Sequence, residues 1–164
     1  MFKSIDMATG NHQIRQAFKR LIRVIQTDVE HKRVDNDSGV NLIKGDVVYN
    51  VTSGARSVAQ AVNDSLAHAN WVGVMSEPVV DGARGIARTE GYALVRYNAL
   101  TTDPTDHEGV PVYVSSVAGT CSIDDPGGFS QIVGILGNAQ DYDADDNPFV
   151  HVFLNHCCEP ISNA

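Results

Sequence analysis

The chain has 164 residues, of which 43% are hydrophobic and 20% are charged, and its formal net charge at pH 7 is −8. This composition excludes an intrinsically disordered protein, and the length allows one domain, or two small ones, to bury a core. The acidic balance argues against nucleic acid and anionic membrane as partners of the whole chain.

The charge is distributed unevenly along the chain. Residues 1–33 contain seven basic and three acidic side chains, a net charge of +4, whereas residues 34–164 contain five basic and seventeen acidic ones, a net charge of −12. Only the N-terminal segment therefore has the charge to bind nucleic acid or an anionic membrane.

The three cysteines, Cys121, Cys157 and Cys158, do not form the pattern of a secreted disulfide framework, because their number is odd and two are adjacent. No basic-then-apolar signal peptide opens the chain, and no run approaches 18 apolar residues. We expect free thiols in a reducing cytosol, and a protein that is made soluble in the cytoplasm or is assembled there into a larger structure.

The first predicted element is an amphipathic helix over residues 11–33, NHQIRQAFKRLIRVIQTDVEHKR. Its apolar residues fall on one stripe at helical spacing, and its basic residues lie mostly off that stripe. The helix either packs its stripe on its own domain or docks on a partner; a nucleic-acid arm fits less well, because no aromatic residues interleave with the basic ones. The candidate partner-binding residues are Arg15, Phe18, Lys19, Arg20, Leu21, Ile22, Arg23 and Ile25.

The pattern changes to β after a break at residues 34–39, VDNDSG. Short stretches rich in β-branched residues follow, separated by clusters of Gly, Pro, Asn and Asp. The exception is residues 57–70, SVAQAVNDSLAHAN, which suit a short helix or a loop with a turn. No second long helix alternates with strands, which argues against a parallel βαβ sheet. The strand candidates are residues 41–53, 71–80, 85–98, 109–117, 130–138 and 149–156.

Three pairs of segments indicate an internal repeat. Residues 45–49 match residues 109–113, residues 71–74 match residues 132–135, and residues 93–98 match residues 150–155 less closely. The glycine in each Val-Gly pair suits a β-bulge or a close backbone approach. We predict a mainly β protein with small barrel-like or sandwich-like modules. An N-terminal arm, residues 1–39, precedes a β body, residues 40–164, whose two related halves span about residues 40–100 and 104–158.

Motifs for catalysis and metal binding are weak. The acidic run DYDADDN, residues 141–147, departs from a calcium loop at its sixth and twelfth positions, so we expect a solvated acidic turn, with a weak cation site as the alternative. His151, His156 and the adjacent Cys157 and Cys158 lack the paired spacing of a zinc site. The chain has no G-x-S-x-G, P-loop or H-E-x-x-H motif. We predict no catalytic residue, no metal and no cofactor.

Two single residues have simple interpretations. Cys121 lies in a β stretch and is expected to be a small buried apolar residue. Trp71 is the only tryptophan, and a place in the core or at a subunit interface is favoured over a sugar-stacking platform.

The segments GDVVYNVTSG, WVGVMSEPVVDGARGIARTEGYALVRYN and GVPVYVSS with QIVGILGNA resemble the head-decoration, or cement, proteins of tailed bacteriophages over about residues 40–155. The resemblance implies a non-enzymatic virion protein that is mostly β and often trimeric. Such a protein is assembled in the host cytoplasm, binds the capsid exterior and clamps neighbouring major capsid protein subunits, without direct contact with nucleic acid or membrane. A phage tail or fibre component, a carbohydrate- or protein-binding β module, a small enzyme and an adaptor with a docking helix remain as alternatives.

Overall fold

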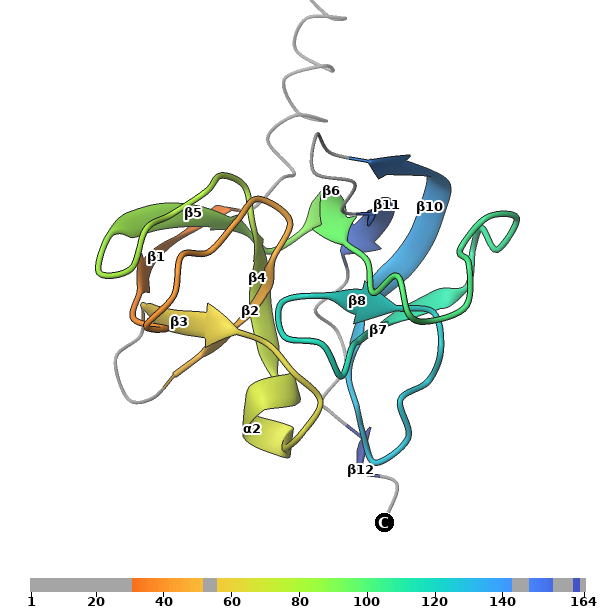
Figure 1. Cartoon of the computed structure of the whole chain (residues 1–164), viewed down its shortest axis with the longest axis horizontal. Helices are drawn as coiled ribbons and strands as arrows, with labels where there is room; N and C mark the ends of the chain where they lie inside the picture. The colour runs from red at the N-terminus through yellow and green to blue at the C-terminus, as the bar shows by residue number, and fades with distance from the viewer. Residues whose placement is uncertain (1–30, 52–55, 143–147, 155–160, 163–164) are drawn as a thin grey trace, which may run out of the picture.

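The computed structural model of the chain describes residues 31–51, 56–142, 148–154 and 161–162. These residues form a mainly β protein in which a closed five-stranded barrel and a second five-stranded sheet lie beside each other (Figure 1). Within these ranges, no helix has the length and apolar character needed to cross a membrane.

The barrel is built by the first part of the described chain. Its strand order is β1-β3-β2-β4-β5, and it closes where β1 pairs with β5 in antiparallel fashion. A short helix, α2 (Leu66–Ala69), connects β3 to β4 and is capped by Ser65, whose hydroxyl accepts a hydrogen bond from the His68 amide. The five strands are β1 (His31–Asn36), β2 (Val47–Asn50), β3 (Ser57–Gln60), β4 (Trp71–Met75) and β5 (Arg84–Arg88).

The second sheet is entirely antiparallel and has the order β6-β11-β10-β7-β8. A separate two-stranded sheet joins β9 (Phe129–Ser130) to β12 (Ile161–Ser162). The strands of the second sheet are β6 (Gly91–Arg96), β7 (Pro111–Val114), β8 (Cys121–Ser122), β10 (Ile132–Tyr142) and β11 (Pro148–Leu154).

The helix predicted to run to residue 33 is wrong for its last three residues, which belong to β1. Val34 and Asn36 are buried while His31 and Arg33 are exposed, so this segment follows the two-residue period of a strand. Five residues of β1 pair with β5 and thereby close the barrel. Residues 11–30 of the predicted helix lie outside the described residues.

The predicted repeat is not supported by the fold, although two strand pairs share a local feature. Val48 lies opposite Gly73 in the β2–β4 pair, Val112 lies opposite Gly134 in the β7–β10 pair, and each pair shifts register next to this position. The third predicted pair, residues 93–98 and 150–155, falls largely in β6 and β11. These two strands are neighbours in one sheet and do not occupy equivalent places in two separate halves. The fold therefore does not support two equivalent halves divided near residue 100.

The expectation of a bulge or close approach at the two Val-Gly pairs is confirmed. A Cβ added at Gly73 would lie 2.9 Å from the Ala87 Cβ, and one at Gly134 would lie 2.1 Å from the Phe153 carbonyl oxygen. Neither glycine has a positive φ, so the close approach of a neighbouring strand is what excludes a side chain.

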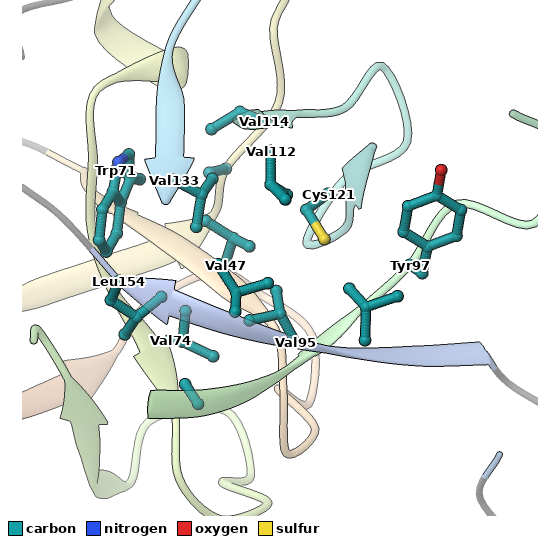
Figure 2. Packing of buried hydrophobic residues seen from close by; sticks show 14 of the residues in the cluster. Val47, Trp71, Val74, Val95, Tyr97, Val112, Val114, Cys121, Val133 and Leu154 are labelled. Carbon is teal, nitrogen blue, oxygen red and sulfur yellow. The ribbon is translucent and has the colours of Figure 1, made fainter. Parts of the chain in front are cut away.

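One hydrophobic core joins the two sheets. Side chains of the barrel strands β2 and β4 pack with side chains of β6, β7, β10 and β11 in a single buried cluster (Figure 2). Successive strand residues point to opposite faces, so Val47 enters this shared core while Val48 enters a second core inside the barrel. The fully buried members of the shared core include Val47, Trp71, Val74, Val95, Val112, Val114 and Val133.

Candidate functional site

Trp71 lies in the shared core at the joint between the barrel and the second sheet. Its side chain is fully buried, and its indole Nε1 donates a hydrogen bond of 2.9 Å to the Ile132 carbonyl oxygen (Figure 2). The indole therefore ties β4 of the barrel to the start of β10, and its ring faces are not accessible for stacking on a sugar.

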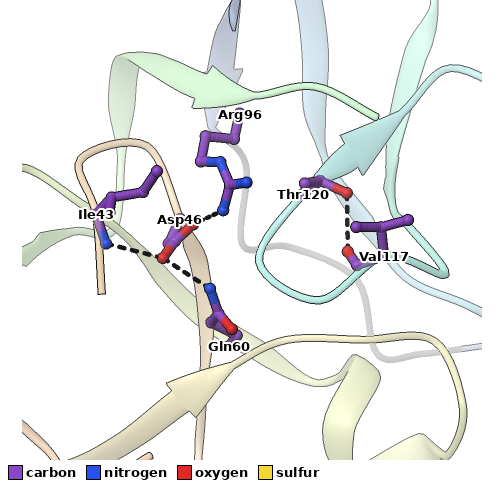
Figure 3. A network of polar contacts seen from close by, with 6 residues as sticks. All are labelled: Ile43, Asp46, Gln60, Arg96, Val117 and Thr120. Atoms are coloured by element: carbon purple, nitrogen blue, oxygen red, sulfur yellow. Dashed lines mark hydrogen bonds and ion pairs between the residues drawn. The ribbon is translucent and has the colours of Figure 1, made fainter. Parts of the chain in front are cut away.

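A buried carboxylate forms the polar part of the joint (Figure 3). Asp46 precedes β2 and has no exposed surface. Its Oδ1 accepts from Arg96 Nη1 at 2.5 Å, and its Oδ2 accepts from the Ile43 amide at 2.9 Å and from Gln60 Nε2 at 3.0 Å. Gly119 packs directly against this carboxylate, because a Cβ there would lie 2.7 Å from Asp46 Oδ1.

This network connects four separate parts of the chain. Gln60 ends β3 of the barrel, Arg96 ends β6 of the second sheet, and the backbone at Gly45 also accepts a hydrogen bond from the Arg96 amide at 3.0 Å. Hydrogen bonds from three separate parts of the chain converge on the buried Asp46 carboxylate, so the network ties the barrel to the second sheet.

A crevice of about 380 Å³, the joint crevice, opens between the two sheets next to this joint. Two cationic side chains, Lys44 and Arg88, line it from the barrel side, and His151 lines it from β11. None of the described residues that line it is acidic. The residues of the joint crevice are Lys44, Val74, Met75, Ser76, Arg88, Tyr92, Ala93, Leu94 and His151.

Three polar atoms of the joint crevice residues are buried and have no hydrogen-bond partner in the described part of the chain: Ser76 Oγ, Arg88 Nε and His151 Nδ1. Buried polar groups in native proteins are nearly always satisfied, so three such atoms around one cavity form an unusual concentration. The rings of Tyr92 and His151 stack with centroids 4.9 Å apart, and Arg88 Nη1 donates to the Tyr92 carbonyl oxygen. These contacts hold Arg88 and His151 in place.

A second concave feature, the outer-face groove, lies on the side of the second sheet away from the core. It has a volume of about 700 Å³ and is mainly apolar. Phe153 is 55% exposed and Ile135 is 38% exposed, and the Phe153 ring meets Tyr92 edge-on with centroids 4.7 Å apart. Desolvation, and then the nearby Glu108 carboxylate, raise the pKa of Tyr92, so this hydroxyl is neutral at physiological pH. The groove residues are Tyr92, Glu108, Gly109, Ile135, Leu136, Gly137 and Phe153.

Acidic residues in the turns act mainly as hydrogen-bond acceptors for their own loop or for a neighbouring one. The Thr105 hydroxyl lowers the pKa of Asp103, the Thr102 amide lowers that of Asp124, and the Ser130 hydroxyl lowers that of Asp125. Such side chains fix turns and need no ligand to explain them. Within the described ranges, no group of three or more His, Cys, Asp or Glu side chains is placed to hold a metal ion.

Most residues singled out by their sequence pattern fall outside the described ranges. All eight candidate docking residues do so: Arg15, Phe18, Lys19, Arg20, Leu21, Ile22, Arg23 and Ile25. Of the C-terminal group, His151 lies in β11, whereas His156, Cys157 and Cys158 are not described. Of the acidic run, Asp141 and Tyr142 end β10, and residues 143–147 are not described.

Cys121 is fully buried in the shared core, and burial raises the pKa of its thiol far above the ordinary value. A thiol that stays protonated and has no access to solvent is a poor nucleophile. We expect iodoacetamide at pH 8 to leave Cys121 unmodified in the native protein and to alkylate it in denaturing urea. Peptide mass spectrometry measures both reactions, and equal labelling in the two states would contradict the buried position.

Sequence reasoning did not identify the joint crevice or the outer-face groove. Lys44, Ser76, Arg88 and His151 are separated by up to about a hundred residues, and none belongs to a motif. Comparison of the chain with protein-family models, with curated proteins and with solved structures finds no match.

Proposed function

We propose that the protein is a non-enzymatic structural protein of a tailed-phage virion, which binds the outer surface of the capsid and cements neighbouring major capsid protein subunits. The observation that carries the proposal is the shared core, which makes one stiff body out of two β units. A cement protein needs a rigid body broad enough to span a joint between subunits, together with a surface that docks. The resemblance of residues 40–155 to decoration proteins supplies the class of partner.

The outer-face groove is the docking surface in this proposal. Exposed aromatic side chains beside an apolar hollow are typical of the residues that dominate binding energy in protein interfaces. Phe153, Tyr92 and Ile135 provide such a surface, and Glu108 at its edge provides a polar contact. A capsid protein segment with an apolar side chain would fill the groove.

The charge distribution supports a position on the outside of the capsid. Residues 34–164 carry a net charge of −12, which disfavours contact with packaged DNA. The basic residues 1–33 add attraction to an acidic surface of the capsid or of a neighbouring protomer. A homotrimer would engage three capsid subunits at once and would gain avidity from weak single contacts.

The proposal is tested by sedimentation of the purified protein with phage capsids assembled without it. We expect saturable binding, and we expect Phe153→Asp to weaken it at least tenfold, because a charge would be buried in the groove. Val80→Asp is the matched control, since Val80 is 60% exposed and lies outside the groove, and it should bind like the parent chain.

Two results would count against this function. If the parent chain stays unbound at all concentrations, the capsid is not the partner, and a tail or fibre component becomes the better proposal. If Phe153→Asp and Val80→Asp bind equally well, the outer-face groove is not the docking surface.

A further inference from the structure

We propose that the joint crevice is a binding site for a small oxyanion, a carboxylate or a phosphate. The site is separate from the outer-face groove, although Tyr92 borders both. The inference does not rest on the virion function, because it follows from the charge, burial and hydrogen-bonding capacity of the crevice itself.

The charge of the crevice is the first argument. Lys44 and Arg88 bring two positive charges to its wall, and neither pairs with a carboxylate among the residues that the structure describes. The chain as a whole has 20 acidic and only 12 basic residues, so a crevice whose described lining holds two cationic side chains and no acidic one departs from the average charge of the chain. An anion is the ligand that such a wall attracts.

Hydrogen-bonding capacity is the second argument. Arg88 Nε can only donate, the Ser76 hydroxyl can donate, and His151 Nδ1 donates in one tautomer and when the ring is protonated. All three atoms are buried and have no hydrogen-bond partner among the residues that the structure describes. An oxyanion has several acceptor lone pairs, so once a side-chain rearrangement brings these atoms to the wall of the crevice, one bound group could accept from Ser76, which follows β4, from Arg88 of β5 and from His151 of β11.

Pre-organisation is the third argument. The Tyr92 carbonyl oxygen holds one edge of the Arg88 guanidinium, and the Tyr92 ring stacks on His151 at an interplanar angle of 17°. These contacts restrict the motion of both side chains before a ligand arrives, so only a small rearrangement remains to be made on binding and less entropy is lost. The volume of about 380 Å³ admits a phosphate or a small dicarboxylate and excludes large ligands.

The test is a titration of the isotope-labelled full chain with inorganic phosphate, and separately with succinate, at pH 7 and constant ionic strength. Two-dimensional NMR should record saturable shifts of the Lys44, Ser76, Arg88 and Tyr92 amides with at least one of the two anions. Binding of one anion alone assigns the site to that chemistry. Both anions together assign a general oxyanion site.

Matched variants locate the binding. Arg88→Gln should weaken binding at least tenfold, while Arg84→Gln, on the same strand but in an exposed ion pair with Asp35, should leave it unchanged. Lys44→Gln should also weaken binding severalfold, and its exposed position keeps the test valid if Arg88→Gln fails to fold. The proposal is overturned if neither anion gives saturable shifts, or if Lys44→Gln and Arg88→Gln bind as tightly as Arg84→Gln.

Discussion

Asp46→Ala is expected to lower the free energy of unfolding by about 3–5 kcal/mol, the loss typical of breaking a buried ion pair from one side. The substitution leaves Arg96 partly buried without its carboxylate, and it removes the acceptor for Gln60 Nε2 and the Ile43 amide (Figure 3). Urea denaturation followed by far-UV circular dichroism measures the change.

Asp35→Ala is the matched control for this loss. Asp35 also pairs with an arginine, Arg84, but the Arg84 side chain is 76% exposed and that of Asp35 is 33% exposed. A solvent-exposed pair contributes about 0–1 kcal/mol, so this variant should be nearly as stable as the parent chain. Equal stability losses in Asp46→Ala and Asp35→Ala would contradict the role given to the buried network.

Gly134→Ala is expected to lower the free energy of unfolding by about 4 kcal/mol, and the melting temperature by about 8–16 °C. The new methyl group would lie 2.1 Å from the Phe153 carbonyl oxygen and 2.8 Å from its carbon. Both are backbone atoms of β11, so no side chain can rotate away, and β10 must separate locally from its partner strand. Thermal unfolding measured by circular dichroism gives the size of the effect.

Gly82→Ala separates this steric effect from ordinary backbone strain. Gly82 has a φ of +75° and nothing within 4 Å of an added Cβ, so its replacement should cost only the strain of the left-handed conformation, about 1–2 kcal/mol. A melting temperature of Gly134→Ala that equals or exceeds that of Gly82→Ala would contradict the close approach of β10 and β11.

The sequence pattern was sufficient for the β class and for most strand positions. Alternation of buried and exposed residues in stretches such as residues 93–98 and 149–156 is a local property, and it survives in β6 and β11. A glycine inside a strand is also a local signal, and the two Val-Gly pairs correctly predicted that a neighbouring strand approaches closely at Gly73 and Gly134.

Pairing between strands that lie far apart in the sequence determined the features of the fold that the local sequence pattern did not predict. Residues 31–33 continue a helical pattern on the N-terminal side, but they pair with β5, which lies more than fifty residues away in the sequence. The repeat predicted two equivalent halves, but β6 pairs with β11, which lies much later in the sequence. The barrel is instead completed by β1, which precedes the predicted β body. Tertiary contacts override local propensity in both cases.

The same limit applies to the candidate sites. Asp46 lies within the strand candidate of residues 41–53, and nothing in its sequence neighbourhood indicates that Arg96 lies beside it. The joint crevice depends on side chains from four separate segments, and the distinction between Arg88, which lines it, and Arg84, which does not, appears only in three dimensions. Composition alone had pointed to the N-terminal segment as the place for basic binding residues.

Native-state hydrogen exchange in low urea concentrations tests whether the barrel and the second sheet form one body through their shared core. We expect amides of β2 in the barrel and of β11 in the second sheet to open with the same free energy and the same urea dependence, because both require loss of the shared core. A barrel that opens at clearly lower free energy, with a smaller urea dependence, while the second sheet stays protected would contradict it.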